Sequence, residues 1–297
     1  MFALINRTLD NLSVRLKLTL GFGLVLALTL AITLTGWHGL DNMIERSESI
    51  SAIGQLSNLT KDLRAERIIF REENTPQSAA RVEQRLNELE SHLGMLRKEI
   101  DGPQNLDLLT VQSRIVASLE KTFAELAQQR QIRDQTSEKL AQQAVQAVAA
   151  VGQVETEVLK SLSQEQDNAE RLEEFPTLAQ LKQQIQLARF QVQAYTFSGK
   201  QEDERSAVTA IDEALKEVQE IAREQAEDNL QALKPAAEAL QAYKEQLLRF
   251  RDAQSGVEQS QESMETLGDQ MLESVAQLIT LQGVQRDDQA NRSRTAL

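Results

Sequence analysis

Helix breakers are scarce in this sequence, and their scarcity constrains the fold more than any other feature. The 297 residues include only 12 glycines and 4 prolines, while alanine, leucine, glutamine and glutamate dominate. Such a composition is typical of long helices packed as bundles or coiled coils, and no stretch shows the alternating β-branched pattern of a strand. We therefore predict an all-α fold. The few breakers predict turns at Pro76, Gly102-Pro103, Pro176, Gly199 and Pro235.

The spacing of these turns predicts the architecture. We expect six helices over residues 40–74, 77–100, 104–172, 177–198, 201–228 and 229–297. Short connections make consecutive helices antiparallel, and each residue adds about 1.5 Å of helix length. The third and sixth helices are then long enough to run through two stacked four-helix bundles that share them. The lower bundle would hold about 40–136 and 264–297, and the upper bundle about 137–263.

One stretch, from Leu18 to Trp37, carries no charge. Twenty helical residues span about 30 Å, the thickness of a hydrocarbon core, so we predict a transmembrane helix. A cleaved signal peptide is the alternative, but its apolar region would be shorter. The positive-inside rule places residues 1–17 in the cytoplasm and residues 38–297 outside. The charges on which this orientation depends are Arg7, Arg15 and Lys17 before the stretch, and Asp41 and Glu45 after it.

Charge and composition exclude several classes of function. The net charge of -13 disfavours nucleic-acid binding, which needs a basic surface. Because the chain has no cysteine and 2 histidines, we expect no disulfide and no metal site, and we expect no other cofactor. No nucleophile with its base, no phosphate-binding loop and no dinucleotide fingerprint occurs in the sequence. We therefore predict that the chain is not an enzyme.

The stretch "LTKDLRAERIIFREEN" places arginines on the packing face of the first helix. Leu56, Leu63 and Phe70 form one apolar row at spacings of seven, and the adjacent row is Ile53, Thr60 and Arg67, with Arg64 one turn earlier. A buried guanidinium is costly without a counter-ion, and its planar fork suits carboxylates. The pattern favours a small organic acid as ligand. Polar residues that only set helix register, or pairing of Arg67 with a glutamate, are the alternatives.

The other long helices turn polar at similar heights. By helical rise, Arg67 lies level with about residues 118–124 of the third helix and 264–270 of the sixth. We interpret the coincidence as a pocket inside the lower bundle. Lys121 is an ambiguous member, for which a solvated or interface position is the alternative. The candidate ligand-binding residues there are Thr60, Arg64, Arg67, Lys121, Thr122, Gln129 and Gln261.

The upper bundle offers a weaker candidate in "QLARFQVQAYTF". Tyr195 ends one apolar row of this helix, and Arg189 lies on the flank. The pattern alone favours a solvated or interface arginine at this position. We nevertheless retain Arg189 and Tyr195 as candidate ligand-binding residues of the upper bundle.

Several motifs resemble one family in order and spacing, over essentially the whole chain. They are "NLSVRLKLTLGFGLVLALTL" with "LTGW", "LTKDLRAER", "ASLEKTF", "LARFQVQAY" and "LQGVQRDDQANRSRTAL". The chain resembles the helical bimodular sensor domain of bacterial methyl-accepting chemotaxis receptors, especially pseudomonad receptors for tricarboxylic-acid-cycle intermediates. The resemblance implies a homodimer in the bacterial inner membrane, with a periplasmic sensor. It also implies a lower pocket for di- and tricarboxylates such as malate, succinate and citrate, and an upper pocket for acetate.

The resemblance carries over to three residues and fails at a fourth. Arg64 and Arg67 match arginines of the family's first helix, and Arg189 matches one of its fourth helix. Near "VEQSQESMETLG" the family would place another basic contact, whereas this chain has Gln261, so its preferred acid can differ. Relatives on this scaffold also sense amines, and a histidine kinase could carry the same sensor. A membrane-anchored coiled-coil scaffold is the alternative from a different class.

The sequence ends without a second span or a signalling hairpin. A complete receptor of this family would continue into a cytoplasmic region that signals to kinase and adaptor proteins. We therefore expect residues 1–297 to be the anchor and sensor of a longer protein.

Overall fold

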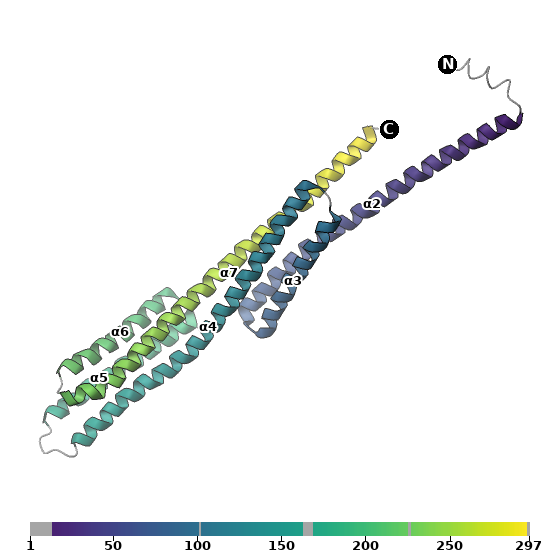
Figure 1. The fold of residues 1–297 in the computed structure, drawn as a ribbon. Helices are drawn as coiled ribbons and strands as arrows, with labels where there is room; N and C mark the ends of the chain where they lie inside the picture. Colours follow the sequence, from purple (N-terminus) through teal and green to yellow (C-terminus); the bar gives the residue numbers. More distant parts are fainter. Residues whose placement is uncertain (1–13, 101, 163–168, 225–226, 296–297) are drawn as a thin grey trace. The chain divides into compact units, whose positions relative to one another are not determined.

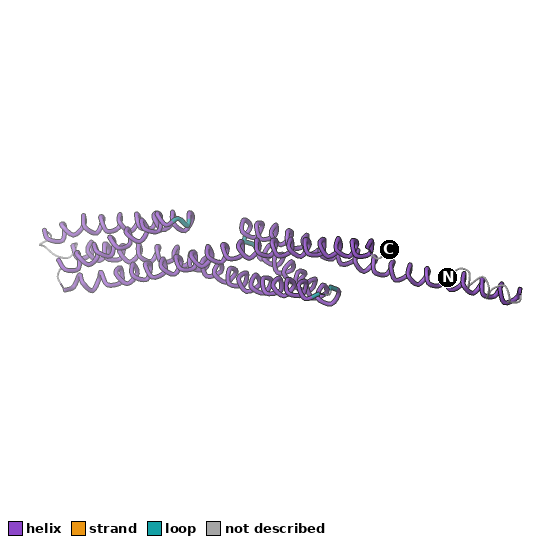
Figure 2. Tube along the Cα trace, turned by 90° about the horizontal axis from the view of Figure 1, so that it is seen from above, coloured by secondary structure: helices purple, strands orange, loops and turns teal. Residues whose placement is uncertain are grey.

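The computed structural model describes residues 14–100, 102–162, 169–224 and 227–295, and throughout these ranges the regular structure is α-helical, with no strand (Figures 1 and 2). The all-α prediction is confirmed for this part of the chain. The helices are α2 (Val14–Glu73), α3 (Pro76–Glu99), α4 (Pro103–Leu162), α5 (Ala169–Ser198), α6 (Gln201–Glu224) and α7 (Glu227–Thr295).

Three of the predicted turns lie where local sequence chemistry ends one helix and starts the next. Thr75 caps α3, because its side chain accepts from the Ser78 backbone while the Ser78 side chain accepts from the Thr75 backbone. Gly102 has φ 106° immediately before α4, and Gly199 has φ 66° between α5 and α6. Glycine adopts such positive φ values without a steric penalty. The turns at Pro76, Gly102-Pro103 and Gly199 are confirmed.

The turns predicted at Pro176 and Pro235 are wrong. Pro176 lies inside α5 and Pro235 inside α7. A proline in a helix removes one backbone hydrogen bond and costs about 3 kcal/mol. Leu178, two residues beyond Pro176, is buried in the same apolar core as Leu233 and Ala236, which lie on either side of Pro235. These buried contacts keep both helices continuous. The end of the third helix also differs from the prediction: α4 ends at Leu162, not at residue 172.

The chain divides into two compact units, each containing segments of four helices. Unit 1 comprises Met1–Ala117 and Gly268–Leu297, and unit 2 comprises Ser118–Leu267. The boundaries predicted from the sequence between the two bundles lay after residues 136 and 263. The stacking of the two units stays a prediction, and each unit is described by itself below.

Within unit 1, side-chain contacts link each helix segment to its neighbours. The ring Nε2 of His92 on α3 lies 2.6 Å from the Ala52 carbonyl of α2, and must donate because a carbonyl only accepts. Arg97 of α3 donates to Thr110 of α4 at 2.8 Å. Asn105 of α4 contacts Gln285 of α7 at 3.4 Å. These contacts, with the α2–α7 pairs described below, complete a ring of four helices.

Unit 2 has two clusters of buried apolar residues, and α4, α5, α6 and α7 contribute to both. Figure 1 shows α5 and α6 side by side, joined by the turn at Gly199. Two apolar rows of α5 are buried: Leu178, Ile185 and Val192, and Leu181, Ala188 and Tyr195. In α7 the row Tyr243, Phe250, Val257 and Met264 is also buried, as are Met271 and Leu278, which continue this row in unit 1.

The N-terminal part of α2 presents large apolar side chains to its surroundings. Phe22 is 71% exposed and Trp37 68%, and the described residues between 22 and 34 are exposed on every side of the helix. The side chains at 18, 20, 21, 35 and 36 lie outside the described residues, as do residues 1–13. Among the described side chains, no helix is long and apolar enough to cross a membrane. The span from Leu18 to Trp37 stays a prediction.

Candidate functional site

Arg67 of α2 lies directly against Gly268 of α7 within unit 1. A Cβ at position 268 would stand 2.3 Å from Nη1 of Arg67, far inside contact distance, so only glycine leaves room for the guanidinium. Arg67 itself is half-buried. The prediction that Arg67 lies level with residues 264–270 of the sixth helix is confirmed. The alignment of Arg67 with residues 118–124 of the third helix stays a prediction, because those residues belong to unit 2.

Arg64 is more open than expected. Its side chain is 55% exposed, and its Nη1 lies 3.9 Å from Oδ1 of Asp269, which is 63% exposed. The expectation that both arginines are enclosed between helices is therefore wrong for Arg64. The reason is helix geometry: Arg64 follows the buried Leu63 by one residue, which turns it about 100° away from the core. An exposed ion pair of this length contributes about 0–1 kcal/mol.

Two neighbours on α2 complete the surroundings of these arginines. Thr60 is 3% exposed, and its hydroxyl donates to the Leu56 carbonyl at 2.8 Å, so its lone pairs alone remain for another partner. Glu66 accepts from Nε of Arg81 on α3 at 2.9 Å, and this hydrogen bond raises the pKa of Arg81. The carboxylate next to Arg67 in sequence is thus engaged by another helix.

The remaining residues predicted for the lower pocket lie in unit 2. Lys121 is 79% exposed and lies 3.8 Å from Glu125 of its own helix. Thr122 and Gln261 are half-buried. Gln129 packs on Gly256 of α7, where a Cβ would stand 2.9 Å from its Cδ. The structure therefore brings Arg64 and Arg67 together with α7 in unit 1, while the predicted partners from the third and sixth helices occupy the other unit.

The candidates of the upper bundle differ in character. Tyr195 is a core residue, 2% exposed, whose ring packs edge-on against Phe250 with centroids 5.4 Å apart. Burial raises the pKa of Tyr195 to about 12. Arg189 is half-buried, and its charge partly offsets the upward shift that burial imposes on the pKa of Tyr243. A role of Arg189 or Tyr195 in ligand binding stays a prediction.

Sequence reasoning missed one cation, Arg130. It is 5% exposed and is the one buried arginine or lysine in the described part of the chain. The signal was present: Phe123, Arg130 and Ala144 lie at multiples of seven, in a row that is buried on α4. The candidate residues predicted on this helix, Lys121, Thr122 and Gln129, lie in other rows.

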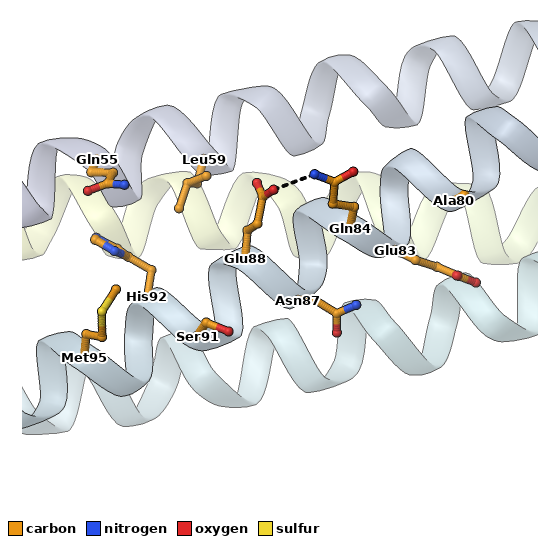
Figure 3. Close-up of a pocket in the computed structure, with 10 residues that line it drawn as sticks. All are labelled: Gln55, Leu59, Ala80, Glu83, Gln84, Asn87, Glu88, Ser91, His92 and Met95. Carbon is orange, nitrogen blue, oxygen red and sulfur yellow. Dashed lines mark hydrogen bonds between the residues drawn. The ribbon is translucent and has the colours of Figure 1, made fainter.

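Pockets occur in both units. In unit 1, a pocket of about 560 Å³ lies between α2 and α3 (Figure 3). Its carboxylate Glu88 accepts hydrogen bonds from Gln84 and Arg85, and these bonds lower the pKa of Glu88. No arginine or lysine lines this pocket, so it does not suit an acid. In unit 2, a pocket of about 360 Å³ lies between α4 and α7. No cluster of potential metal ligands occurs among the described residues.

Comparison with known proteins agrees with this architecture. The family model described as helical bimodular sensor domain matches residues 37–293. The methyl-accepting chemotaxis protein McpQ of Pseudomonas putida is 31% identical over all 297 residues, which cover 45% of its length. McpS of the same species is 27% identical over 83% of this chain and 37% of its own. McpK of Pseudomonas aeruginosa is 29% identical over 80% of this chain and 36% of its own.

The chain thus spans less than half the length of each of these relatives. The family match nevertheless covers most of the chain, including all of unit 2, most of unit 1 and helices α3 to α7 except the last residues of α7. On this basis the chain belongs to the helical bimodular sensor domain family, whose members sense signals and do not catalyse reactions.

Proposed function

We propose that this chain is the sensor region of a methyl-accepting chemotaxis receptor, and that it binds a small di- or tricarboxylate in unit 1. The observation that carries the proposal is the apposition of Arg64 and Arg67 on α2 with Gly268 and Asp269 on α7. All three relatives compared above are methyl-accepting chemotaxis proteins by name.

The chemistry of these residues fits an acid with more than one carboxylate. Two guanidinium groups one turn apart offer two planar forks, and each fork binds one carboxylate through parallel hydrogen bonds. The missing side chain at Gly268 lets the Arg67 fork lie directly against α7. The exposed Arg64 is reachable from solvent, and its long contact with Asp269 is weak enough for a ligand to replace.

Binding of this kind supplies a signal if the ligand prefers one arrangement of α2 and α7. A dicarboxylate that bridges the arginines of α2 and the backbone of α7 has such a preference, because its contacts depend on the register of the two helices. Only a difference in affinity between two states shifts their populations. The change on α7 would be a small slide of packed helices, the shear type of motion.

The proposal includes the placement in the membrane. We propose that residues 18–37 anchor the chain in the bacterial inner membrane and that residues 38–297 form a periplasmic sensor. The uncharged stretch of twenty residues and the exposed apolar side chains from Phe22 to Leu34 support this placement. We further propose that the chain forms a homodimer and continues into a cytoplasmic region that acts on kinase and adaptor proteins.

A binding screen tests the ligand. Residues 1–297 in detergent would be titrated with succinate, malate and citrate, and with amines and amino acids, by thermal shift and calorimetry. We expect a carboxylate to raise the melting temperature of the wild-type chain and of Lys61→Gln, an exposed cation on the same helix. Arg67→Gln should abolish the rise and Arg64→Gln should reduce it.

The competing functions make different predictions in the same screen. A rise in melting temperature with amines alone would identify an amine sensor and refute the proposed ligand. A chain that responds to no small molecule would support the coiled-coil scaffold. Equal responses of wild type, Arg67→Gln and Lys61→Gln to an acid would place its site elsewhere.

A further inference from the structure

Three large apolar side chains of α5 are exposed on the surface of unit 2. Phe190 is 65% exposed, Phe197 96% and Leu187 49%. The core of unit 2 takes the opposite side of the helix, where Ala188 and Val192 are buried, and Phe190 lies about 200° around the helix axis from each of them. Contiguous apolar side chains left in water on one side of a helix indicate a surface that another molecule covers.

The exposed side chains follow the spacing of a helix–helix contact. Five residues of α5 are separated alternately by four and three positions, and we call them the α5 face: Gln183, Leu187, Phe190, Ala194 and Phe197. This spacing is the one at which two helices of a coiled coil bury a shared seam. The α5 face is therefore suited to a second helix that lies along it.

The α5 face carries no charge, although 26% of the residues in the chain are charged. Between residues 177 and 198 the charged residues are Lys182 and Arg189, both half-buried on the flanks of the helix. A molecule recognised by its charge has nothing to pair with along this seam. When two copies of one helix pack in parallel about a two-fold axis, each seam residue meets its own copy, so a charge there would meet a like charge. The absence of charge thus favours a second copy of this chain.

The polar residues on this side of α5 also suit contact with identical residues. Gln183, Gln186 and Gln193 are exposed. A glutamine amide both donates and accepts, so it can form a hydrogen bond with the same residue of a second copy, whereas two lysines or two ionised glutamates cannot. Aromatic side chains with few charges are also typical of the centre of a protein interface.

We propose that the α5 face pairs with the α5 face of a second copy, with the two helices parallel. This inference rests on the homodimer proposed above and names the surface by which unit 2 takes part in it. Each phenylalanine buries about 150–250 Å², so the four rings of Phe190 and Phe197 in two copies give about 600–1,000 Å². Stable interfaces bury about 1,200–2,000 Å². The α5 contact is therefore weak by itself, and its test must trap contacts that are short-lived.

The experiment is cysteine cross-linking of residues 1–297 in detergent, since the chain has no cysteine of its own. Gln183→Cys and Ala194→Cys place a thiol in the seam and keep its large apolar residues. Gln219→Cys on α6 is the matched control, an exposed glutamine of the same unit. Two cysteines form a disulfide only when their Cα atoms lie within about 7 Å, so both seam variants should form the cross-linked dimer at least about tenfold faster than the control.

A second set of variants tests which side chains hold the contact. In the Gln183→Cys protein, Phe190→Gln with Phe197→Gln should slow the cross-link to the rate of the α6 control. Val145→Gln with Leu159→Gln, two exposed apolar residues of α4 in the same unit, should leave the rate unchanged. Because all four side chains are exposed, the melting temperature should stay close to that of the wild-type chain in both variants.

Three outcomes would overturn the inference. Equal rates for the seam variants and Gln219→Cys would mean that the copies collide without a preferred surface. A rate unaffected by Phe190→Gln with Phe197→Gln would mean that the apolar side chains do not hold the copies together. A Gln183→Cys protein that cross-links only when mixed with Phe197→Cys would mean that the helices are antiparallel. None of these results concerns the unit 1 arginines, so the carboxylate-induced rise in melting temperature would still test the proposed ligand separately.

Discussion

Replacing Gly268 by alanine tests the central contact of the proposed site. The new Cβ would stand 2.3 Å from Nη1 of Arg67, whereas ordinary contacts begin at 3.4 Å. The guanidinium, the far end of a flexible side chain, must therefore retreat by about 1 Å or the helices α2 and α7 must separate. Movement of the guanidinium is the easier response, because side-chain torsions rotate over low barriers, whereas separating two packed helices loses many contacts.

Gly268→Ala should change the free energy of unfolding only slightly but lower the affinity for the ligand strongly. Alanine in a helix interior is favoured over glycine by about 1 kcal/mol, and moving the Arg67 fork cancels part of this gain. The free energy of unfolding should thus change by about 0–1 kcal/mol. A displaced fork loses a charge-assisted hydrogen bond, which contributes about 1.5–3 kcal/mol. Affinity for the organic acid should therefore fall by about tenfold to a hundredfold.

The assay is a double-mutant cycle with a matched glycine. Gly268→Ala, Arg67→Ala and the double variant would be compared by urea unfolding and by ligand titration. Gly283 of the same helix has no atom within 4 Å of an added Cβ, so Gly283→Ala should give the full gain of about 1 kcal/mol and leave affinity unchanged. In the Arg67→Ala background, Gly268→Ala should recover that gain, with a coupling energy of about 0.5–1 kcal/mol.

Two results would refute the reasoning. Additive effects of Gly268→Ala and Arg67→Ala on the free energy of unfolding would mean that the two residues do not touch. Unchanged affinity in Gly268→Ala, alongside lost affinity in Arg67→Ala, would mean that the ligand does not need the fork at its present position.

Three further predictions follow from the described contacts. Asp269→Asn removes a negative charge beside Arg64. Affinity for the ligand should therefore rise by about fourfold for each of its negative charges at low salt, so calorimetry should show a larger gain for citrate than for succinate. An equal gain for both acids would contradict this prediction. Burial raises the pKa of Tyr195 to about 12, whereas the ordinary tyrosine pKa is about 10, so the unfolded chain loses this proton at a lower pH than the folded chain. The contribution of Tyr195 to the free energy of unfolding is therefore complete below pH 10 and is lost as pH rises through 12. In urea unfolding, the free energy of unfolding of the wild-type chain should fall between pH 9 and pH 11, and Tyr195→Phe should show a smaller fall. An equal fall in both proteins would contradict this prediction. Thr75→Ala removes the capping box with Ser78 and should lower the free energy of unfolding by about 1 kcal/mol, measured by urea, whereas Thr75→Ser should restore it.

Part of the candidate site was predictable because helix geometry is local. The rise per residue alone puts Arg67 level with residues 264–270 of the last helix, and Gly268, which it contacts, lies in that range. The same argument could not tell that Arg64 points outward, since one residue of rotation separates a buried position from an exposed one. It also passed over Arg130, because several rows of α4 are buried once four helices surround it, and periodicity alone does not show how wide the buried face is.

The sequence by itself determined the helical class, the caps at Thr75 and Gly199, and the apolar rows from Tyr243 to Leu278, all of which depend on neighbours within two turns. Tertiary structure decided what local preference could not. Burial of Leu178 just beyond Pro176, and of Leu233 and Ala236 on either side of Pro235, kept α5 and α7 continuous, because apolar contacts outweigh one lost hydrogen bond. It also decided which carboxylate engages which arginine, since residues distant in sequence meet only once the helices have packed.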